Sequence, residues 1–261
     1  MTDTDIRPSS APRGIWLGVF RGLIAVFGIC SIAWAVFSIT VYRAEAPFAG
    51  ASGDILRGES FDSAKLSELK QQLDSTPADR LRPVALVDVA VIRLRLLEIK
   101  MTEGATWEES PEFADVEAAF VAALSKNPSN SFLWSADYWV GRVRGDATDG
   151  GIKLLRMSYE TGPNEAWVAQ RRNPVALGNF SSLPQDLAEH ALSEFARLVQ
   201  SGLYRDAANI LAGPGWPVRQ QLLSRLAPLD EADRFAMARE LNYRQLDGVS
   251  VPGIERPSRP F

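Results

Sequence analysis

Apolar and charged positions are distributed unevenly along the chain. Residues 22–42, GLIAVFGICSIAWAVFSITVY, contain 21 consecutive positions without a charge. As a helix this stretch is roughly 32 Å long, which matches the bilayer hydrocarbon core of about 30 Å. A cleaved signal peptide has a shorter apolar region, of about 7 to 15 residues. The pattern therefore predicts an uncleaved transmembrane helix over 22–42.

The basic residues around this span predict its direction. Arg7, Arg13 and Arg21 precede it, whereas Arg43 alone follows it before the first acidic residues. Segments rich in arginine and lysine stay on the cytoplasmic side. We therefore expect residues 1–21 in the cytoplasm and the rest of the chain in the periplasm. The Ala-, Arg- and Leu-rich composition indicates a bacterial source and thus the inner membrane.

Small residues line one side of the N-terminal helix. Gly14, Gly18 and Gly22 are spaced four apart, which allows a neighbouring helix to approach closely. Glycine is common in membrane helices in any context, so helix packing through this stripe is an alternative and not the main prediction. Cys30, the only cysteine, falls in the middle of the span, where an apolar thiol is expected.

Beyond the span, the apolar spacing is that of helices. Residues 43–60 are small, Gly-rich and polar, and we expect a linker there. Residues 61–246 show helical periodicity without convincing alternation of period two, and 247–261, with three prolines, are expected to form a tail. The predicted fold class is all-α: one N-terminal transmembrane helix, then a solenoid of helical hairpins or a bundle. The expected helices cover 62–73, 84–101, 111–125, 131–143, 151–160, 164–172, 185–200, 204–211, 218–226 and 230–245.

Two segments of this domain share a spacing. Each closes a helix with a proline, Pro128 or Pro163, and the two prolines are 35 positions apart. The next helix in each case carries a tryptophan, Trp134 or Trp167, and these are 33 apart. Both periods bracket the 34-residue period of tetratricopeptide repeats.

The second-helix signature of that family is approximated twice, by Val116, Phe120, Ala123 and Pro128, and by Gly151, Leu155, Ser158 and Pro163. The first helix departs from it, because Asp137, Tyr138 and Gly141 stand where Leu, Gly and Tyr are expected. The chain thus resembles a degenerate tetratricopeptide array over roughly 110–200. The resemblance implies stacked hairpins, with Trp134 and Trp167 in their core, and an irregular bundle is the alternative. The expected pairs are 62–101, 111–143, 151–172 and 185–211.

Composition narrows the chemistry. His190 and Cys30 are the single histidine and cysteine, which excludes two-histidine metal motifs and CxxC pairs. The sequence has no Walker loop and no GxSxG motif. We therefore expect no catalytic residue, metal or cofactor. Since carboxylates alone can cleave glycans, an enzyme using Glu160 and Glu165 is an alternative, although both are expected at solvent-facing helix ends.

The charge of the outer part limits its partners. The chain has 28 basic and 32 acidic residues. Four arginines and two aspartates lie in residues 1–43, so the remainder carries a net charge of -6. This acidic balance argues against nucleic acid and against anionic lipid as partners of the outer domain.

Aromatic residues and arginines concentrate between positions 134 and 180. Trp, Tyr and Arg dominate binding hot spots, and helical repeats bind partners on their concave face. We expect Tyr138, Trp139, Arg142 and Arg171 to be exposed in a partner-binding groove. Such a groove could also take a glycan polymer.

These features predict a membrane-anchored helical-repeat adaptor or assembly factor. It would contact the bilayer through residues 22–42 and bind another cell-envelope protein in the periplasm. The resemblance to anchored helical-repeat proteins points to polysaccharide export or assembly. The alternatives are a structural single-pass subunit of a membrane complex and a carboxylate-dependent glycan-cleaving enzyme. No nucleic-acid partner is expected.

Overall fold

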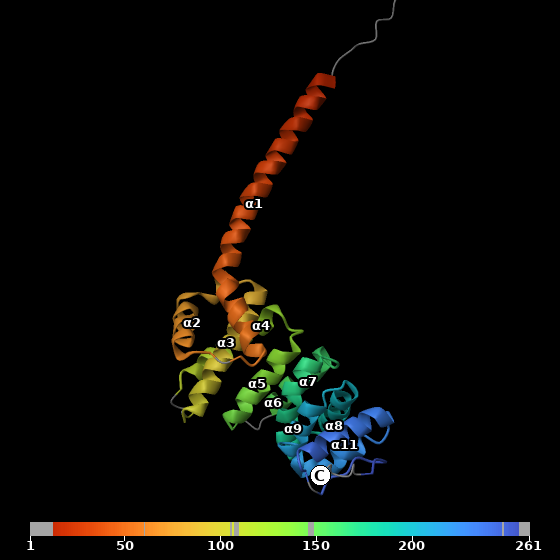
Figure 1. Cartoon of the computed structure of the whole chain (residues 1–261). Coiled ribbons are helices and arrows are strands. Elements are labelled where there is room, and N and C mark those ends of the chain that lie inside the picture. Colours follow the sequence, from red (N-terminus) through yellow and green to blue (C-terminus); the bar gives the residue numbers. More distant parts are fainter. Residues whose placement is uncertain are drawn as a thin grey trace, which may run out of the picture.

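The computed structural model describes residues 13–59, 61–104, 106, 110–145, 149–246 and 248–255. Within these ranges the regular elements are all helices and there is no strand, which confirms the all-α fold class. The helices follow one another in chain order away from α1, and the C-terminal helices lie at the far end of the domain (Figure 1). The α-helices are α1 (Arg13–Leu56), α2 (Ser63–Ser75), α3 (Pro83–Thr102), α4 (Glu112–Lys126), α5 (Ser131–Val143), α6 (Asp149–Thr161), α7 (Ala166–Gly178), α8 (Gln185–Gln200), α9 (Tyr204–Ala212), α10 (Arg219–Ser224) and α11 (Glu231–Tyr243). The short 3-10 helices are η1 (Ala78–Arg80), η2 (Phe180–Ser182) and η3 (Trp216–Val218).

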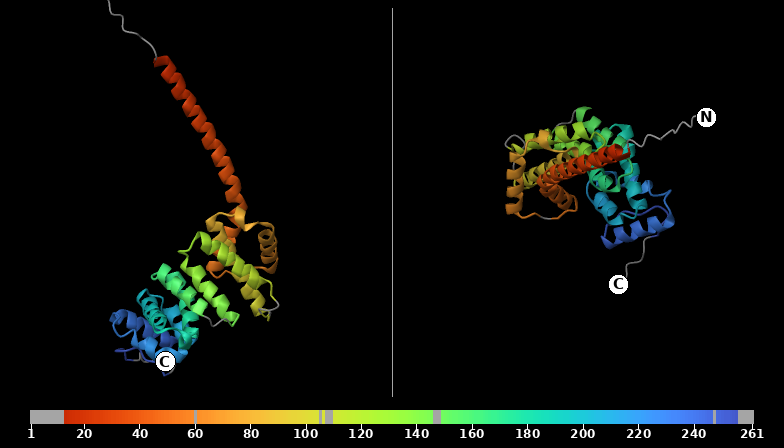
Figure 2. Two further views of the ribbon diagram at one scale, coloured as in Figure 1. Left: turned by 180° about the vertical axis from the view of Figure 1, so that it is seen from behind. Right: turned by 90° about the horizontal axis from the view of Figure 1, so that it is seen from above.

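Helix α1 is one unbroken helix of 44 residues. Its segment Trp16–Thr40 has a mean hydropathy of 2.2, and none of that segment is buried in the domain. The helix is about 66 Å long at about 1.5 Å per residue, and its N-terminal half projects freely from the domain (Figure 2). By length and composition, α1 can cross a membrane.

The expected linker over 43–60 is wrong for residues 43–56, which form the last turns of α1. Pro47 removes one helical N–H, and the local sequence is rich in glycine. The apolar face nevertheless docks onto α3, where Phe48 and Ala51 are 2% and 3% exposed. Tertiary burial of one face outweighs weak helix propensity. The domain therefore follows the candidate span without a flexible spacer.

The hairpins pair one helix later than expected. The most extensive contacts join α3 to α4, α5 to α6 and α7 to α8, and α1 also packs along α3. The predicted pairings within 62–101 and within 151–172 are therefore wrong. Helix α3 is apolar on nearly every side, so it packs against both α1 and α4. Helix α2 contributes Leu69 and Leu73 to the apolar cluster that α1 and α3 share.

The apolar core is divided into clusters that follow one another along the domain. One joins α1, α2 and α3, the next joins α3, α4 and α5, and the largest fills the space among α6 to α11. Phe120, Ala123, Leu155 and Ser158, which match the repeat signature, are all at most 1% exposed. Helices that contact mainly their neighbours in this way are typical of stacked helical proteins.

The expected tail 247–261 packs onto the domain over much of its length. Val249 and Val251 are buried in the C-terminal cluster. Arg234 Nη1 donates to the carbonyl oxygen of Pro252 at 2.7 Å. Residues 249–254 are therefore part of the domain, whereas residue 247 and residues 256–261 lie outside the described part.

Candidate functional site

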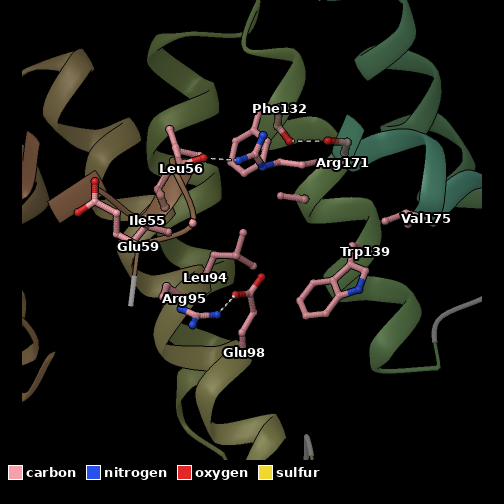
Figure 3. Close-up of a pocket in the computed structure, with 14 residues that line it drawn as sticks. Ile55, Leu56, Glu59, Leu94, Arg95, Glu98, Phe132, Trp139, Arg171 and Val175 are labelled. Atoms are coloured by element: carbon pink, nitrogen blue, oxygen red, sulfur yellow. Dashed lines mark hydrogen bonds and ion pairs between the residues drawn. The ribbon is translucent and has the colours of Figure 1, made fainter. Parts of the chain in front are cut away.

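A pocket of about 510 Å³ opens where four helices meet, α1, α3, α5 and α7 (Figure 3). Ile55 and Leu56 come from the last turn of α1, and Leu94 comes from α3. Phe132 and Trp139 contribute the aromatic wall from α5. Since these side chains are apolar, the pocket can take an apolar side chain or a small hydrophobic group.

Arg171, on α7, reaches across the mouth of this pocket to α1 (Figure 3). Its Nη2 donates to the carbonyl oxygen of Leu56, the last residue of α1, and its Nη1 donates to that of Trp167 at 3.0 Å. Burial lowers the pKa of Arg171, which still remains charged at neutral pH. Among the described residues no carboxylate forms an ion pair with it. The pocket therefore holds a cation that can accept an anionic partner.

The carboxylates at the rim are already engaged by arginines. Glu98 Oε2 lies 2.9 Å from Arg95 Nη1, and Glu59 Oε1 lies 3.0 Å from Arg57 Nε. These pairs are exposed and contribute little to stability. They leave the rim polar and close to neutral. The charge of Glu98 also acts on Arg171, but within the described part of the chain the Arg171 guanidinium forms no ion pair.

The structure separates the four residues predicted for a groove. Trp139 and Arg171 line the same pocket, as drawn in Figure 3. Arg142 is half-buried and its Nε donates to Asn179 Oδ1 at 2.7 Å. The prediction of an exposed Tyr138 is wrong, because its side chain is 1% exposed. Helix α5 packs against α4, α6 and α7, and adjacent helix positions point about 100° apart, so Tyr138 is buried while Trp139 reaches the pocket.

The two tryptophans expected in the core lie nearer the surface. Trp167 is 42% exposed, and its ring centroid lies 5.3 Å from that of Phe132. Trp134 is half-buried, and its Nε1 donates to the carbonyl oxygen of Pro128 at 2.8 Å. The core prediction is therefore wrong for Trp167, which extends the aromatic wall beyond the pocket.

Sequence reasoning missed the part of the pocket that comes from α1. Ile55 and Leu56 fell in the expected linker, so they were not considered as lining residues. A signal was present, because Phe48, Ala51 and Ile55 are spaced i, i+3 and i+7, which is the stripe of an amphipathic helix. The Gly-rich composition around this stripe concealed it.

A second polar cluster lies deep in the domain and was also missed. Arg172 and Glu194 are 0% and 1% exposed, and Arg172 Nε donates to Glu194 Oε1 at 3.0 Å. Tyr159 donates its hydroxyl to Glu194 Oε2 at 3.2 Å, and Asn173 Nδ2 donates to a carbonyl oxygen of α8 at 2.8 Å. Burial and the charge of Glu194 hold the pKa of Tyr159 well above its usual value. These groups bond to one another across α6, α7 and α8, so they link the helices.

The residues weighed for chemistry lie apart from the pocket. Glu160 and Glu165 are both exposed, and Glu165 accepts a hydrogen bond from Ser131 Oγ. His190 is exposed and stacks on Tyr159, with ring centroids 5.2 Å apart. Across the described ranges, no group of three or more His, Cys, Asp or Glu side chains is placed to hold a metal ion.

The glycine stripe of α1 faces open space. A Cβ added at Gly18 or at Gly22 would meet nothing within 4 Å. The surroundings of Gly14 lie outside the described residues, as does Arg7, which contributes to the predicted orientation.

The pocket at the C-terminal end of α1 combines apolar side chains, an aromatic wall and an arginine without an ion-pair partner in the described part of the chain. It is therefore the candidate functional site. Comparison with protein-family models, with curated proteins and with solved structures finds no match to this chain.

Proposed function

We propose that this chain is a single-pass membrane protein whose helical domain acts as an adaptor for another cell-envelope protein. The observation that supports this proposal is the pocket at the C-terminal end of α1, with Trp139 on its wall and Arg171 at its mouth. Aromatic residues and arginines supply most hot-spot energy when an apolar anchor of the partner fills a pocket. The partner would insert one apolar side chain and place a carboxylate on Arg171.

A protein partner accounts for the surface around the pocket better than a small molecule does. Trp167 lies one helical turn before Arg171 and is 42% exposed. Its ring centroid is 5.7 Å from the guanidinium carbon of Arg171 and it also packs on Phe132. The apolar surface therefore continues beyond the cavity, as it does at protein interfaces, where a central anchor is surrounded by further contacts.

The proposed location is the inner membrane of a bacterium, with the N-terminus in the cytoplasm and the domain in the periplasm. Arg13 precedes the apolar segment Trp16–Thr40, Arg21 lies near the N-terminal end of that segment and directly before the uncharged stretch 22–42, and Arg43 follows it. This bias favours a cytoplasmic N-terminus. We also propose that the helices over roughly residues 110–200, α4 to α8, descend from a tetratricopeptide-like array, which the buried Phe120 and Leu155 support.

Site-specific photo-crosslinking in cells tests the adaptor. A photoreactive residue at position 139 is expected to give one discrete crosslinked product, identified by mass spectrometry. A photoreactive residue at Tyr243, 84% exposed on the distal α11, is the control and should not give that product. Adding Val175→Trp, which fills the pocket from α7, should abolish the product at 139. The adaptor proposal is wrong if positions 139 and 243 give the same crosslinked products, or if Val175→Trp leaves the product at position 139 unchanged.

A structural subunit bound through its span is the second candidate, because Gly18 and Gly22 present an open small-residue face on α1. Such a face permits close helix contact in the membrane. Replacing both glycines with leucine should leave co-purification of the crosslinked partner intact if the pocket binds it. Loss of the partner in the leucine variant, with retention in Val175→Trp, would favour the structural subunit.

A further inference from the structure

We infer that the helical domain lies directly on the lipid headgroups of the bilayer that α1 crosses. The contact would be made by a membrane-proximal surface, which we define as residues 77–84 together with Tyr42. The inference rests on the proposed membrane anchor and adds to it a second, peripheral contact with the same bilayer.

The first step is the distance between the apolar segment and the domain. The apolar segment ends at Thr40, and α1 continues without a break. Tyr42 therefore lies about 3 Å beyond Thr40 along the axis, and Glu45 about 7.5 Å. Since the headgroup layer on each side of a bilayer is about 5 to 7 Å thick, Tyr42 falls inside that layer.

The second step is the contact that brings the domain to this level. The guanidinium carbon of Arg82 lies 3.7 Å from the ring centroid of Tyr42. The backbone N–H of Arg82 donates to Glu45 Oε1 at 3.0 Å, and the two side chains form an ion pair. Glu45 is only 4% exposed, so this junction is fixed. Figures 1 and 2 both show the segment before α3 at the end of the domain from which α1 emerges.

The third step is the chemistry of the surface held there. Tyr42 and Val84 are 59% and 68% exposed, although both are apolar or amphipathic. Arg43, which follows Tyr42 in sequence, is exposed, and so are Asp79 and Arg80 within residues 77–84. Tyrosine is enriched at membrane interfaces, and arginine side chains can reach lipid phosphates. The surface thus suits headgroups, which cover Val84 and accept hydrogen bonds from the arginines.

The acidic charge of the whole domain does not oppose this contact. Arg82 is neutralised by Glu45, and the exposed Asp79 offsets one further charge of the surface. The exposed Arg43 and Arg80 still leave it with one net positive charge for the phosphates that every phospholipid carries. The anchor holds the surface at the bilayer, so no net attraction from solution is needed. The orientation of the domain then follows, because Leu56 and the pocket lie about 24 Å beyond Thr40 along α1.

Fluorescence quenching on the full chain tests the contact. In a Cys30→Ser background, single cysteines replace Val84, Phe27 or Tyr243 and carry an environment-sensitive fluorophore. Each labelled protein is placed in phosphatidylcholine nanodiscs with headgroup spin-labelled lipid, or exposed to aqueous iodide. We expect lipid quenching and a blue-shifted emission at 84, and iodide quenching without lipid quenching at 243, which lies on the distal α11.

The label at Phe27 separates the two proposals, because this residue is 76% exposed in the apolar segment. Nanodiscs with acyl-chain spin-labelled lipid serve for the label at position 27. If that label is quenched while the label at position 84 behaves like the one at position 243, the anchor stands and the headgroup contact is wrong. If 27 is not quenched, the anchor itself is wrong. A label at Arg80→Cys, an exposed position on the same surface, repeats the test should the change at Val84 disturb α3.

Discussion

At the scale of single residues, neighbours in one helix end in opposite surroundings. Tyr138 is buried whereas Trp139 lines the pocket, and Arg172 is enclosed whereas Arg171 lies at the pocket mouth. Sequence could identify α5 and α7 as helices rich in aromatic residues and arginine. It could not give the rotation of each helix about its own axis, which decides which side chains are buried. The apolar residues of α5 and α7 do not form one clear stripe, and each helix packs against more than one neighbour.

Asp137 gives a pH-dependent prediction at this scale. Burial raises the pKa of Asp137 from its usual 3.8 to about 6, with a further rise from Glu117 and a smaller opposing effect of Arg144. The folded chain therefore binds the proton more tightly than the unfolded chain does. Its contribution to stability is complete below about pH 3.8 and is lost as the pH rises through about 6.

Asp137→Asn should therefore raise the free energy of unfolding at pH 8 by about 1 to 2 kcal/mol, after allowance for partial solvation of the side chain. The gain should shrink as the pH falls toward 4. Thermal unfolding of the full chain in detergent, followed by circular dichroism at both pH values, measures it. Asp79→Asn, at an exposed carboxylate in η1, is the control. An equal shift at both pH values would contradict the assignment.

At the scale of elements, the sequence predicted the helices well and their partners poorly. Proline and small polar turns marked most helix ends, so the ranges of α4, α5 and α8 agree closely with expectation. Which helices pair depends on the areas they cover in three dimensions, and α3 is apolar toward both α1 and α4. The linker was misjudged for a related reason, since docking on α3 keeps a Gly-rich segment helical.

The polar link among α6, α7 and α8 gives the prediction for this scale. Arg172 and Glu194 form an ion pair with 0% and 2% of their side chains exposed. Removing one partner leaves a buried charge without compensation, which typically costs about 3 to 5 kcal/mol. Glu194→Leu should therefore lower the free energy of unfolding of the full chain in detergent by about that amount, seen as a lower denaturant midpoint.

The double variant distinguishes the ion pair from simple packing. Arg172→Met combined with Glu194→Leu removes both charges, and such replacements are often close to neutral. We expect the double variant to be more stable than either single variant, although Tyr159 and Ser158 lose hydrogen-bond partners. Additive losses from the two single changes would show that the pair is not coupled.

At the scale of the whole molecule, two facts combine into one geometry. Helix α1 is continuous from its apolar segment to the pocket, and the domain starts within the first turns after Thr40. Sequence alone supplied the apolar segment and the all-α domain. It could not supply the rigid connection, since that depends on the burial of Glu45 and Phe48 against residues distant in sequence.

The proposed orientation gives the last prediction. Arg13 and Arg21 on the N-terminal side outnumber Arg43 on the other, so the domain should face the periplasm. Alkaline phosphatase fused after Phe261 needs oxidising conditions to fold, and it should be active in the full chain. Replacing Arg13 and Arg21 with glutamate, with lysines added after Arg43, should reduce that activity by reversing part of the population. The glutamates and the added lysines both reduce the excess of positive charge on the N-terminal side. Uncharged residues at positions 13 and 21 should therefore give a phosphatase activity between those of the unaltered and the reversed chain. An inactive fusion in the unaltered chain, with a cytoplasmic reporter active at the same end, would place the domain and its pocket on the cytoplasmic side and overturn a periplasmic partner.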